Sequence, residues 1–528
     1  MSKRRRTGIQ GRLFTTDPVE QPLGYQWLIE RYELRVPPPF RRAVRTSRSQ
    51  GEVITTESSR EELFPARTWP RREDDVGHLR FALRHQRLDL NILAAYFKTA
   101  GPKAINQWLD EQPTGGKARR FWFFYEWATG DRLDRPDADS KLNFVDAVDP
   151  RRAYTSRGRP SRRHRVTDNL LGDARYCPMV HRTDVLDHFA EERWDQKIAN
   201  AISGTAAPVR RRAIEYLYRR ETKSSFAIED ESPSIDRIER FVEALRRAGR
   251  EDLCHKDGIL NLQRVIRDPR FVPTDWRRGQ IYVGESISWT EEKIHHICPR
   301  PDDLDELMDG WERCHQRLAE SSETVPAVVR AGVLGYGFVI LHPLDDGNGR
   351  THRLLIHNQL AVGGLTPTDT VIPVSAVMAR DPAAYDRSLE SVSRPLLDQI
   401  EYRLDGTGSM IIESETIDHY RYPNFTVAVE SLTDFVRRSV DEDLSSQLSF
   451  LEQYDATFDA IQSIVDLPDR LLGLMVKITL RNGGRLPKSK RKRHFESLTD
   501  DEVAQIESAV GKILTVNNSD AINRRSIQ

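Results

Sequence analysis

The sequence has few cysteines, and they are scattered. Only four occur in 528 residues, and no two of them form a Cys-x-x-Cys pair. A disulfide-rich secreted domain or a cysteine-based zinc site needs denser or paired cysteines. The pattern therefore favours reduced thiols in a cytoplasmic protein. The four residues are Cys177, Cys254, Cys298 and Cys314.

The sequence also lacks a long hydrophobic run. The segment from Ala331 to Leu341 is only eleven residues long, whereas a membrane-spanning helix needs about 20. The basic start, residues 1–6, is followed by no apolar segment, so it does not predict a secretory signal. We therefore expect no membrane partner and interpret 331–341 as a buried helix.

Net charge is absent as well. The 80 Lys and Arg residues balance 80 Asp and Glu residues. Overall charge thus argues for neither a nucleic-acid nor a membrane partner. Hydrophobic residues make up 38 % of the chain, which is enough for the cores of a globular protein. The length is typical of about three to four domains.

Hydrophobic spacing predicts a mostly α-helical protein. Short strands are expected only over residues 278–284 and 294–297, where they would form a hairpin. Four regions are predicted: a loosely ordered basic, Pro-containing segment (1–75), a helical region (76–205), a central domain (206–410) and a C-terminal helical region (411–528).

Two basic stretches stand out against the neutral background. Residues 150–165 contain seven arginines, and five of the six residues in 488–493 are Lys or Arg. Each pattern is compatible with a nucleic-acid or acidic partner. Aromatic interleaving is limited to Tyr154, however, and a surface charge run or an internal ion-pair strip is the simpler interpretation.

One polar stretch between two apolar segments concentrates reactive groups. Residues 341–353 read Leu-His-Pro-Leu-Asp-Asp-Gly-Asn-Gly-Arg-Thr-His-Arg, which predicts helix, loop, helix. In this loop His342 can act as a general base near neutral pH. Asp346 offers a hard oxygen ligand for Mg²⁺. Gly347 and Gly349 would let the backbone approach a ligand closely.

The second helix of this stretch would begin at Asn348 and Gly349. Its free N–H groups and positive dipole end favour an anion. Arg350 and Arg353 are three residues apart, so they share a helix face and can clamp a phosphate. Each feature alone is commonly a turn or a solvated face. Together, within twelve residues, they predict a phosphate site.

This stretch resembles the signature of the Fic (fido) family, His-Pro-Phe-x-Asp/Glu-Gly-Asn-Gly-Arg-x-x-Arg. Leu344 stands where the family usually has Phe, which looks like a packing position. The resemblance implies a Fic-type helical core with a small β-hairpin flap, flanked by helical regions. The matching positions are His342, Pro343, Asp346, Gly347, Asn348, Gly349, Arg350 and Arg353.

The resemblance also implies an activity, the transfer of AMP from ATP to a Ser, Thr or Tyr hydroxyl of a protein target. His342 would accept the hydroxyl proton, and Asp346 would hold Mg²⁺. Five residues would bind the phosphates, the first three at the α-phosphate and the two arginines at the β- and γ-phosphates: Gly347, Asn348, Gly349, Arg350 and Arg353.

A second motif precedes the signature. Ser225 and Glu229 resemble the Fic inhibitory motif, Ser/Thr-x-x-x-Glu-Gly/Asn, although Asp230 departs from its last position. The resemblance implies an inhibitory helix whose Glu229 carboxylate pairs with Arg353 and so displaces the γ-phosphate. The alternative is that Glu229 is one of several surface acids at a helix end.

The expected hairpin corresponds to the Fic flap, which holds the target side chain by strand addition. The residues assigned to this flap are Gln280, Ile281, Tyr282 and Val283.

Other functions stay open at this stage. The signature reads phosphates rather than a base, so UTP, GTP or a phosphocholine nucleotide is an alternative donor. Removal of AMP from a target, with Glu229 orienting water, is another alternative, and so is a DNA-binding or scaffolding protein with a vestigial Fic fold. Self-modification and homo-oligomerisation also stay open. The sequence does not predict the target, the trigger that lifts inhibition or the roles of the terminal regions.

Overall fold

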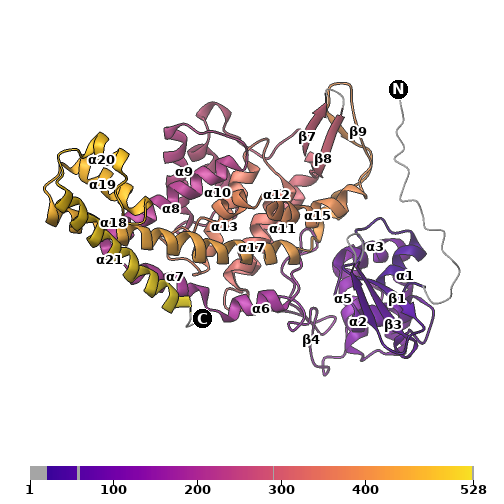
Figure 1. Cartoon of the computed structure of the whole chain (residues 1–528). Coiled ribbons are helices and arrows are strands. Elements are labelled where there is room, and N and C mark those ends of the chain that lie inside the picture. Colours follow the sequence, from indigo (N-terminus) through magenta and orange to yellow (C-terminus); the bar gives the residue numbers. More distant parts are fainter. Residues whose placement is uncertain (1–20, 56–59, 289–290, 526–528) are drawn as a thin grey trace. The chain divides into compact units, whose positions relative to one another are not determined.

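The computed structural model describes residues 21–55, 60–288 and 291–525 (Figure 1). Most elements are helices, and strands occur only in two- and three-stranded sheets, which confirms the mostly α prediction. The chain divides into two compact units. The first comprises Met1–Glu191, Glu251–Gly363 and Ala383–Leu432, and the second comprises Glu192–Arg250, Gly364–Pro382 and Thr433–Gln528.

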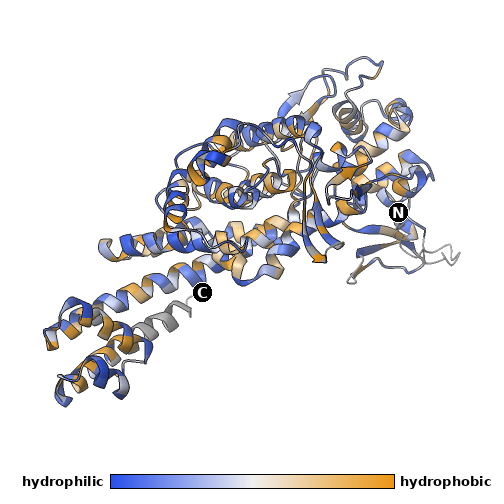
Figure 2. Ribbon diagram, turned by 90° about the horizontal axis from the view of Figure 1, so that it is seen from above, coloured by the Kyte–Doolittle hydropathy of each residue, from blue (hydrophilic) through white to orange (hydrophobic). Residues whose placement is uncertain are grey.

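Many of the helices are amphipathic, as the spacing of apolar residues predicts. In Figure 2 hydrophilic and hydrophobic segments alternate along the ribbons. The predicted domain boundaries at residues 75, 205 and 410 differ from this division into units, because each unit is assembled from segments far apart in the sequence. The boundaries remain predictions about domains.

The N-terminal part of the first unit is a helical layer with a small sheet. The aromatic run Phe121–Tyr125 is buried in α5. The sheet has the order β1-β3-β2, with β1 and β3 parallel. The elements are α1 (Tyr25–Tyr32), β1 (Arg42–Thr46), β2 (Glu52–Thr55), β3 (Arg60–Pro65), η1 (Ala66–Thr68), α2 (Asp75–His85), α3 (Leu90–Ala100), α4 (Lys103–Glu111) and α5 (Gly116–Thr129).

The segment predicted to be loosely ordered, 1–75, is folded over most of its described part. Helix α1 and strands β1–β3 lie within it. Leu23, Ala43 and Phe64 form a small core with Phe81 of α2. These elements are too short to show a hydrophobic period, which explains the wrong prediction for this part.

The arginine-rich segment 150–165 is tied to the protein interior. The Arg163 guanidinium pairs with Glu126 of α5 at 2.9 Å, and His164 Nε2 lies 2.9 Å from the same carboxylate. The segment is not all loop, because β5 (Arg159–Ser161) forms an edge of the sheet β4-β6-β5. Pro160 is tolerated on an edge strand. The internal ion-pair interpretation therefore holds for Arg163. The other strands are β4 (Val145–Asp146) and β6 (Val166–Asp168).

Helix α12 is the centre of the first unit's second core. All of its residues, Ala327–Leu341, are buried, as expected for this apolar segment. A Cβ added at Gly335 would lie 2.7 Å from Ile356 Cγ1, so glycine allows α12 to approach α13 closely. The neighbouring elements are α10 (Lys256–Ile266), η2 (Pro269–Phe271), β7 (Tyr282–Ser288), β8 (Glu291–Ile297), α11 (Pro301–Ala319), α13 (Asn348–Val362), α15 (Pro382–Leu397), β9 (Tyr402–Leu404), β10 (Met410–Ile412), α16 (Ile417–Arg421) and α17 (Thr426–Arg438).

Two short helices follow the N-terminal part, α6 (Asp184–Glu191) and α7 (Trp194–Ser203). Arg193, between them, has φ 51° and ψ 55°, a left-handed conformation that a continuous right-handed helix cannot contain. Helix α6 belongs to the first unit and α7 to the second.

The second unit is a helical assembly around α8. The buried carboxylate of Glu221 on α8 accepts a hydrogen bond from the Ser375 backbone N–H at 2.8 Å. The basic stretch 488–493 lies in α20, which has no buried residue. The helices of the second unit are α7, α8 (Ala207–Ala227), α9 (Ile235–Ala248), α14 (Val374–Arg380), the π-helix η3 (Ser439–Leu444), α18 (Ser445–Ile464), α19 (Asp469–Arg481), α20 (Lys488–His494) and α21 (Asp500–Arg525).

Among the described residues of both units, no helix combines the length and the apolarity that crossing a lipid bilayer requires.

Candidate functional site

His342 ends α12 in a strained conformation. Its backbone has φ 50° and ψ 55°, and its N–H donates to the Phe338 carbonyl at 2.8 Å. A left-handed backbone is uncommon outside glycine and is frequent at functional sites. The ring Nδ1 lies 3.0 Å from the Val339 carbonyl oxygen, which can only accept. Nδ1 therefore carries the proton, and Nε2 keeps a lone pair for a base.

The imidazole of His342 is held in its neutral form. Its ring is partly exposed but closely surrounded by protein atoms, and this desolvation lowers its pKa to about 4. The positive charge of Arg277 lowers it further, against the hydrogen bond to Val339 and the charge of Asp346. At neutral pH the ring can accept a proton.

Arg277 fixes the backbone on both sides of the site. Its Nε donates to the His342 carbonyl at 2.8 Å, and its backbone N–H donates to the Pro343 carbonyl at 2.8 Å. Its Nη1 and Nη2 donate to the carbonyls of Gly279 and Pro299 at 2.7 and 2.6 Å. The side chain is 2 % exposed. Sequence reasoning missed this residue, since it lies 65 positions before His342.

Asn348 shapes the loop from within. Its Oδ1 accepts the Leu344 N–H at 3.0 Å, and its Nδ2 donates to the Leu344 carbonyl at 2.7 Å. Leu344 itself is fully buried. The leucine thus serves as the packing anchor expected at this position. Both polar atoms of the Asn348 side chain are hydrogen-bonded within the loop. Only the backbone N–H of this residue would therefore contact the α-phosphate.

The N-terminus of α13 is open to an anion. Gly347 precedes the helix with φ 84°, which favours glycine, and no side chain caps the helix. The first intrahelical bond is from the Thr351 N–H to the Gly347 carbonyl at 3.0 Å. The N–H groups of residues 348–350 therefore come before the hydrogen-bonded ladder. Gln263 Nε2, from α10, supports this turn through Thr351 Oγ1 at 2.7 Å.

Asp346 is an exposed carboxylate at the loop edge. Its Oδ2 lies 3.0 Å from Arg267 Nη2 and 3.5 Å from Arg350 Nη2. Both guanidinium groups therefore approach this exposed carboxylate. Mg²⁺ in phosphate sites is commonly held by one or two carboxylates together with substrate oxygens. The residues present therefore fit a magnesium ion. Arg267 was not predicted, because it precedes Asp346 by 79 positions.

The two predicted clamp arginines lie on α13. Arg350 and Arg353 are both at least nine-tenths buried, so their charges face a medium in which electrostatic interactions are strong. The structure thus brings His342, Asp346 and Arg350 together around one turn, with Arg353 one helical turn further on.

The family model described as the Fic/DOC family matches residues 254–360. The chain contains a Fic domain. The matched range includes α10 through α13, and with them His342, the loop and both clamp arginines. The Fic domain therefore covers the site and one part of the first unit.

The chain also has similar sequences among curated proteins. "Protein adenylyltransferase Fic" of Drosophila sechellia and of Drosophila melanogaster are each 39 % identical over 125 residues, 23 % of this chain and 22 % of theirs. The protein of the same name from Drosophila mojavensis is 38 % identical over 99 residues, 19 % of this chain and 17 % of its own. The similarity thus spans less than a quarter of these relatives.

Solved structures with Fic titles are also similar, at low identity. A Fic family protein from Desulfovibrio desulfuricans has 17 % identity and a TM-score of 0.36, covering 57 % of this chain and 87 % of its own. A Fic domain containing signaling protein from Bacteroides thetaiotaomicron has 15 % identity and a TM-score of 0.35, covering 50 % and 97 %.

The residues that resemble the Fic inhibitory motif lie at the end of α8, in the second unit. Ser225 is buried in the helix, whereas Glu229 follows it in a turn, where its N–H donates to the Phe226 carbonyl at 3.0 Å. Asp230 has φ 54°. Asp and Asn tolerate this conformation better than most residues, which explains Asp at a position where the motif has Gly or Asn. The pairing of Glu229 with Arg353 remains a prediction.

The predicted hairpin is present as the antiparallel pair β7–β8 (Figure 1). Strand β7 begins at Tyr282, so the predicted docking residues Gln280 and Ile281 precede it. The Gln280 side chain donates from Nε2 to the Cys298 carbonyl at 2.8 Å. It therefore joins the two chain segments at the base of the hairpin. Val283 is exposed. Target docking by these four residues stays a prediction.

In the described part of the chain, one trio has the composition of a metal site. Donor atoms of Asp252, Cys254 and His315 lie within 4.8 Å of one another. His315 Nε2 pairs with Asp252 at 3.0 Å, and Gln359 Nε2 donates to Cys254 Sγ at 3.3 Å. Burial raises the pKa of the Cys254 thiol well above its usual value, so the thiol stays protonated. Internal hydrogen bonding accounts for the trio without a metal.

Proposed function

We propose that this protein transfers AMP from ATP to a hydroxyl side chain of a protein target. The observation that carries the proposal is the neutral His342, placed beside the open N-terminus of α13 and the Asp346 carboxylate. The name of the Drosophila relatives, protein adenylyltransferase, supports the same reaction.

In the proposed reaction, each group of the loop has a separate role. The Nε2 atom of His342 accepts the proton of the target hydroxyl, and the hydroxyl oxygen bonds to the α-phosphorus of ATP. The bond from that phosphorus to the bridging oxygen breaks, and pyrophosphate leaves with the electron pair. The N–H groups at the start of α13 stabilise the charge that develops on the α-phosphate. Arg350 and Arg353 hold the β- and γ-phosphates.

Asp346 would hold the magnesium ion through its carboxylate. When bound, the ion supplies positive charge that neutralises the phosphates. The guanidinium groups of Arg267 and Arg350 keep the carboxylate at the loop edge, so the chain itself orients this ligand.

Glu229 restrains the resting enzyme in this proposal. Its carboxylate would pair with Arg353 and take the place of the γ-phosphate. The support is the motif at residues 225–229 and the left-handed Asp230 that follows it.

Incubation of the full chain with α-labelled ATP, Mg²⁺ and a cell extract tests the reaction. Wild type should label protein, and His342→Ala should bind ATP but transfer nothing. His494→Ala, on α20, is a matched control that should transfer normally. Parallel incubations with α-labelled UTP and GTP distinguish the donors. Equal labelling by wild type and His342→Ala would refute the proposed base.

A further inference from the structure

A small polar cavity lies in the N-terminal part of the first unit. Its volume is about 160 Å³, which is several times the roughly 30 Å³ that one water molecule occupies in the liquid. It is bounded by α1, by the connection between α2 and α3, and by the loop that carries Arg152. This cavity is separate from the loop of His342 and has no role in the proposed transfer.

Three donors on the cavity wall have no partner within the described residues. The hydroxyl of Tyr25, the Nε2 of Gln86 and the Nη1 of Arg87 are buried and donate to no acceptor. The Tyr25 side chain is 1 % exposed. Buried polar groups are almost always hydrogen-bonded, because an unmet donor costs about 1–3 kcal/mol. Three unmet donors around one cavity indicate a missing acceptor.

The cavity also carries an excess of positive charge. Arg87 stacks on the Phe40 ring at 4.4 Å, and Arg152 donates to the Gln86 carbonyl at 2.7 Å. Neither guanidinium has a carboxylate within ion-pair distance in the part of the chain that the structure describes. Glu430 acts on Arg87 from a distance, and the exposed Arg152 donates to the Leu83 and Gln86 carbonyls, so the positive charge of the lining is only partly offset.

The two acids on the wall have other partners. Glu62 lies 3.6 Å from Arg41, the third arginine of the lining. The Asp89 Oδ1 accepts the N–H of Ile92 and caps α3 at 3.1 Å. The acids therefore leave the charges of Arg87 and Arg152 in place.

The neighbouring histidine responds to this positive field. Burial lowers the pKa of His181 to about 3, and the charges of Arg87 and Arg152 lower it further. The imidazole is therefore neutral, and it can donate one ring N–H without adding a charge.

We propose that this cavity binds a phosphate-class oxyanion between Tyr25, Gln86, Arg87 and Arg152. A tetrahedral oxyanion presents acceptor oxygens in several directions, which suits donors that come from three different segments. One arginine would suffice for a planar carboxylate in bidentate geometry. The volume admits a phosphate group but not a whole nucleotide, since ligand pockets for larger molecules measure about 300–1,000 Å³.

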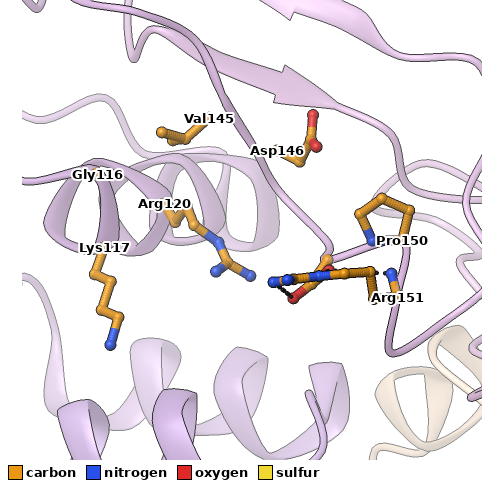
Figure 3. A pocket seen from close by; sticks show the side chains of 8 residues that line it. Gly116, Lys117, Arg120, Val145, Asp146, Pro150 and Arg151 are labelled. Atoms are coloured by element: carbon orange, nitrogen blue, oxygen red, sulfur yellow. Dashed lines mark hydrogen bonds and ion pairs between the residues drawn. The ribbon is translucent and has the colours of Figure 1, made fainter.

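A second hollow in the same region does not share these properties. It is larger, about 480 Å³, and lies at the start of α5 (Figure 3). Its Arg151 is paired with Asp149 at 2.9 Å, and its Arg120 donates to the Ala147 carbonyl at 2.7 Å. None of the described residues that line this hollow has a buried side-chain donor without a partner, so it shows no missing acceptor.

Calorimetric titration of the full chain with inorganic phosphate tests the proposal. Tyr25→Phe removes only the unmet hydroxyl, so binding should weaken about two- to tenfold, the effect of one neutral hydrogen bond. Arg87→Gln should weaken binding about tenfold or more, as for a charged hydrogen bond. Arg84→Gln changes an exposed arginine of α2 outside the cavity and should have no effect.

The same titration separates this cavity from the loop of His342. Phosphate bound at the start of α13 would contribute equally to all four proteins. Without phosphate, Tyr25→Phe should melt at the wild-type temperature, because no hydrogen bond is lost. A parallel titration with glycerol 3-phosphate distinguishes the sources. Comparable binding supports the phosphate end of a larger molecule, and binding of inorganic phosphate alone supports the free ion. Identical isotherms for wild type, Tyr25→Phe and Arg87→Gln, or no binding, would overturn the proposal.

Discussion

The neutral state of His342 predicts an unusual pH dependence of transfer. An unperturbed imidazole, with a pKa of about 6.5, is only about 9 % neutral at pH 5.5. With its pKa lowered to about 4, His342 is about 97 % neutral at that pH. The value of kcat/KM, which reports ionisations of the free enzyme, should therefore change less than about twofold between pH 7.5 and pH 5.5. An unperturbed base would lose about tenfold over this range.

The assay is initial-rate labelling with α-labelled ATP at each pH. Circular dichroism and ATP affinity measured at the same pH values separate the base from folding and binding. The ¹³C-labelled imidazole signal of His342, identified by its loss in His342→Ala, gives the pKa directly. A tenfold fall in kcat/KM with a midpoint near pH 6.5, with folding and ATP affinity constant, would refute the argument from burial.

Three other results follow from the structure. Arg277→Lys should lower the unfolding free energy by about 3 kcal/mol, since one ammonium cannot meet three carbonyls, and thermal melting should show a fall of several degrees. Glu229→Gly should increase self-labelling severalfold if the carboxylate inhibits, whereas Glu231→Gly should not; equal labelling in gels would contradict the inhibitory role. Burial lowers the pKa of His296 and of His352 to about 3, so the unfolded chain binds more protons between pH 6.5 and 3. As the pH is lowered through that window, the free energy of unfolding should fall by up to about 1.4 kcal/mol per pH unit for each histidine. A melting temperature that stays constant from pH 7 to pH 5 would be inconsistent with this.

The local part of the site could be predicted because its residues are contiguous. His342, Asp346 and Gly347 lie within six positions, and the helix–loop–helix pattern fixes their order in space. The buried helix before them was equally visible, since α12 is apolar throughout. A site whose residues are close together in the sequence can be predicted in this way.

The supports of the site could not be predicted, because they come from distant segments. Arg277 contacts His342 across 65 positions, and Arg267 contacts Asp346 across 79. An arginine in a sequence gives no sign that its partners will be backbone carbonyls. The committed side chain of Asn348 was missed for a related reason, since its two bonds to Leu344 form only when the loop closes.

The small elements near the N-terminus escaped prediction for a different reason. Strands of four to six residues, such as β2 and β3, carry too few positions to show alternation. The two compact units also draw on segments separated by more than a hundred residues. Composition along the chain cannot reveal that kind of assembly.

The most direct test of the central claim is the mass of the modified target after incubation with ATP. Peptide mass spectrometry with wild type should find a Ser, Thr or Tyr carrying one AMP, and His342→Ala should give unmodified peptide while still binding ATP. An AMP adduct formed at the wild-type rate by His342→Ala would contradict the role assigned to this imidazole.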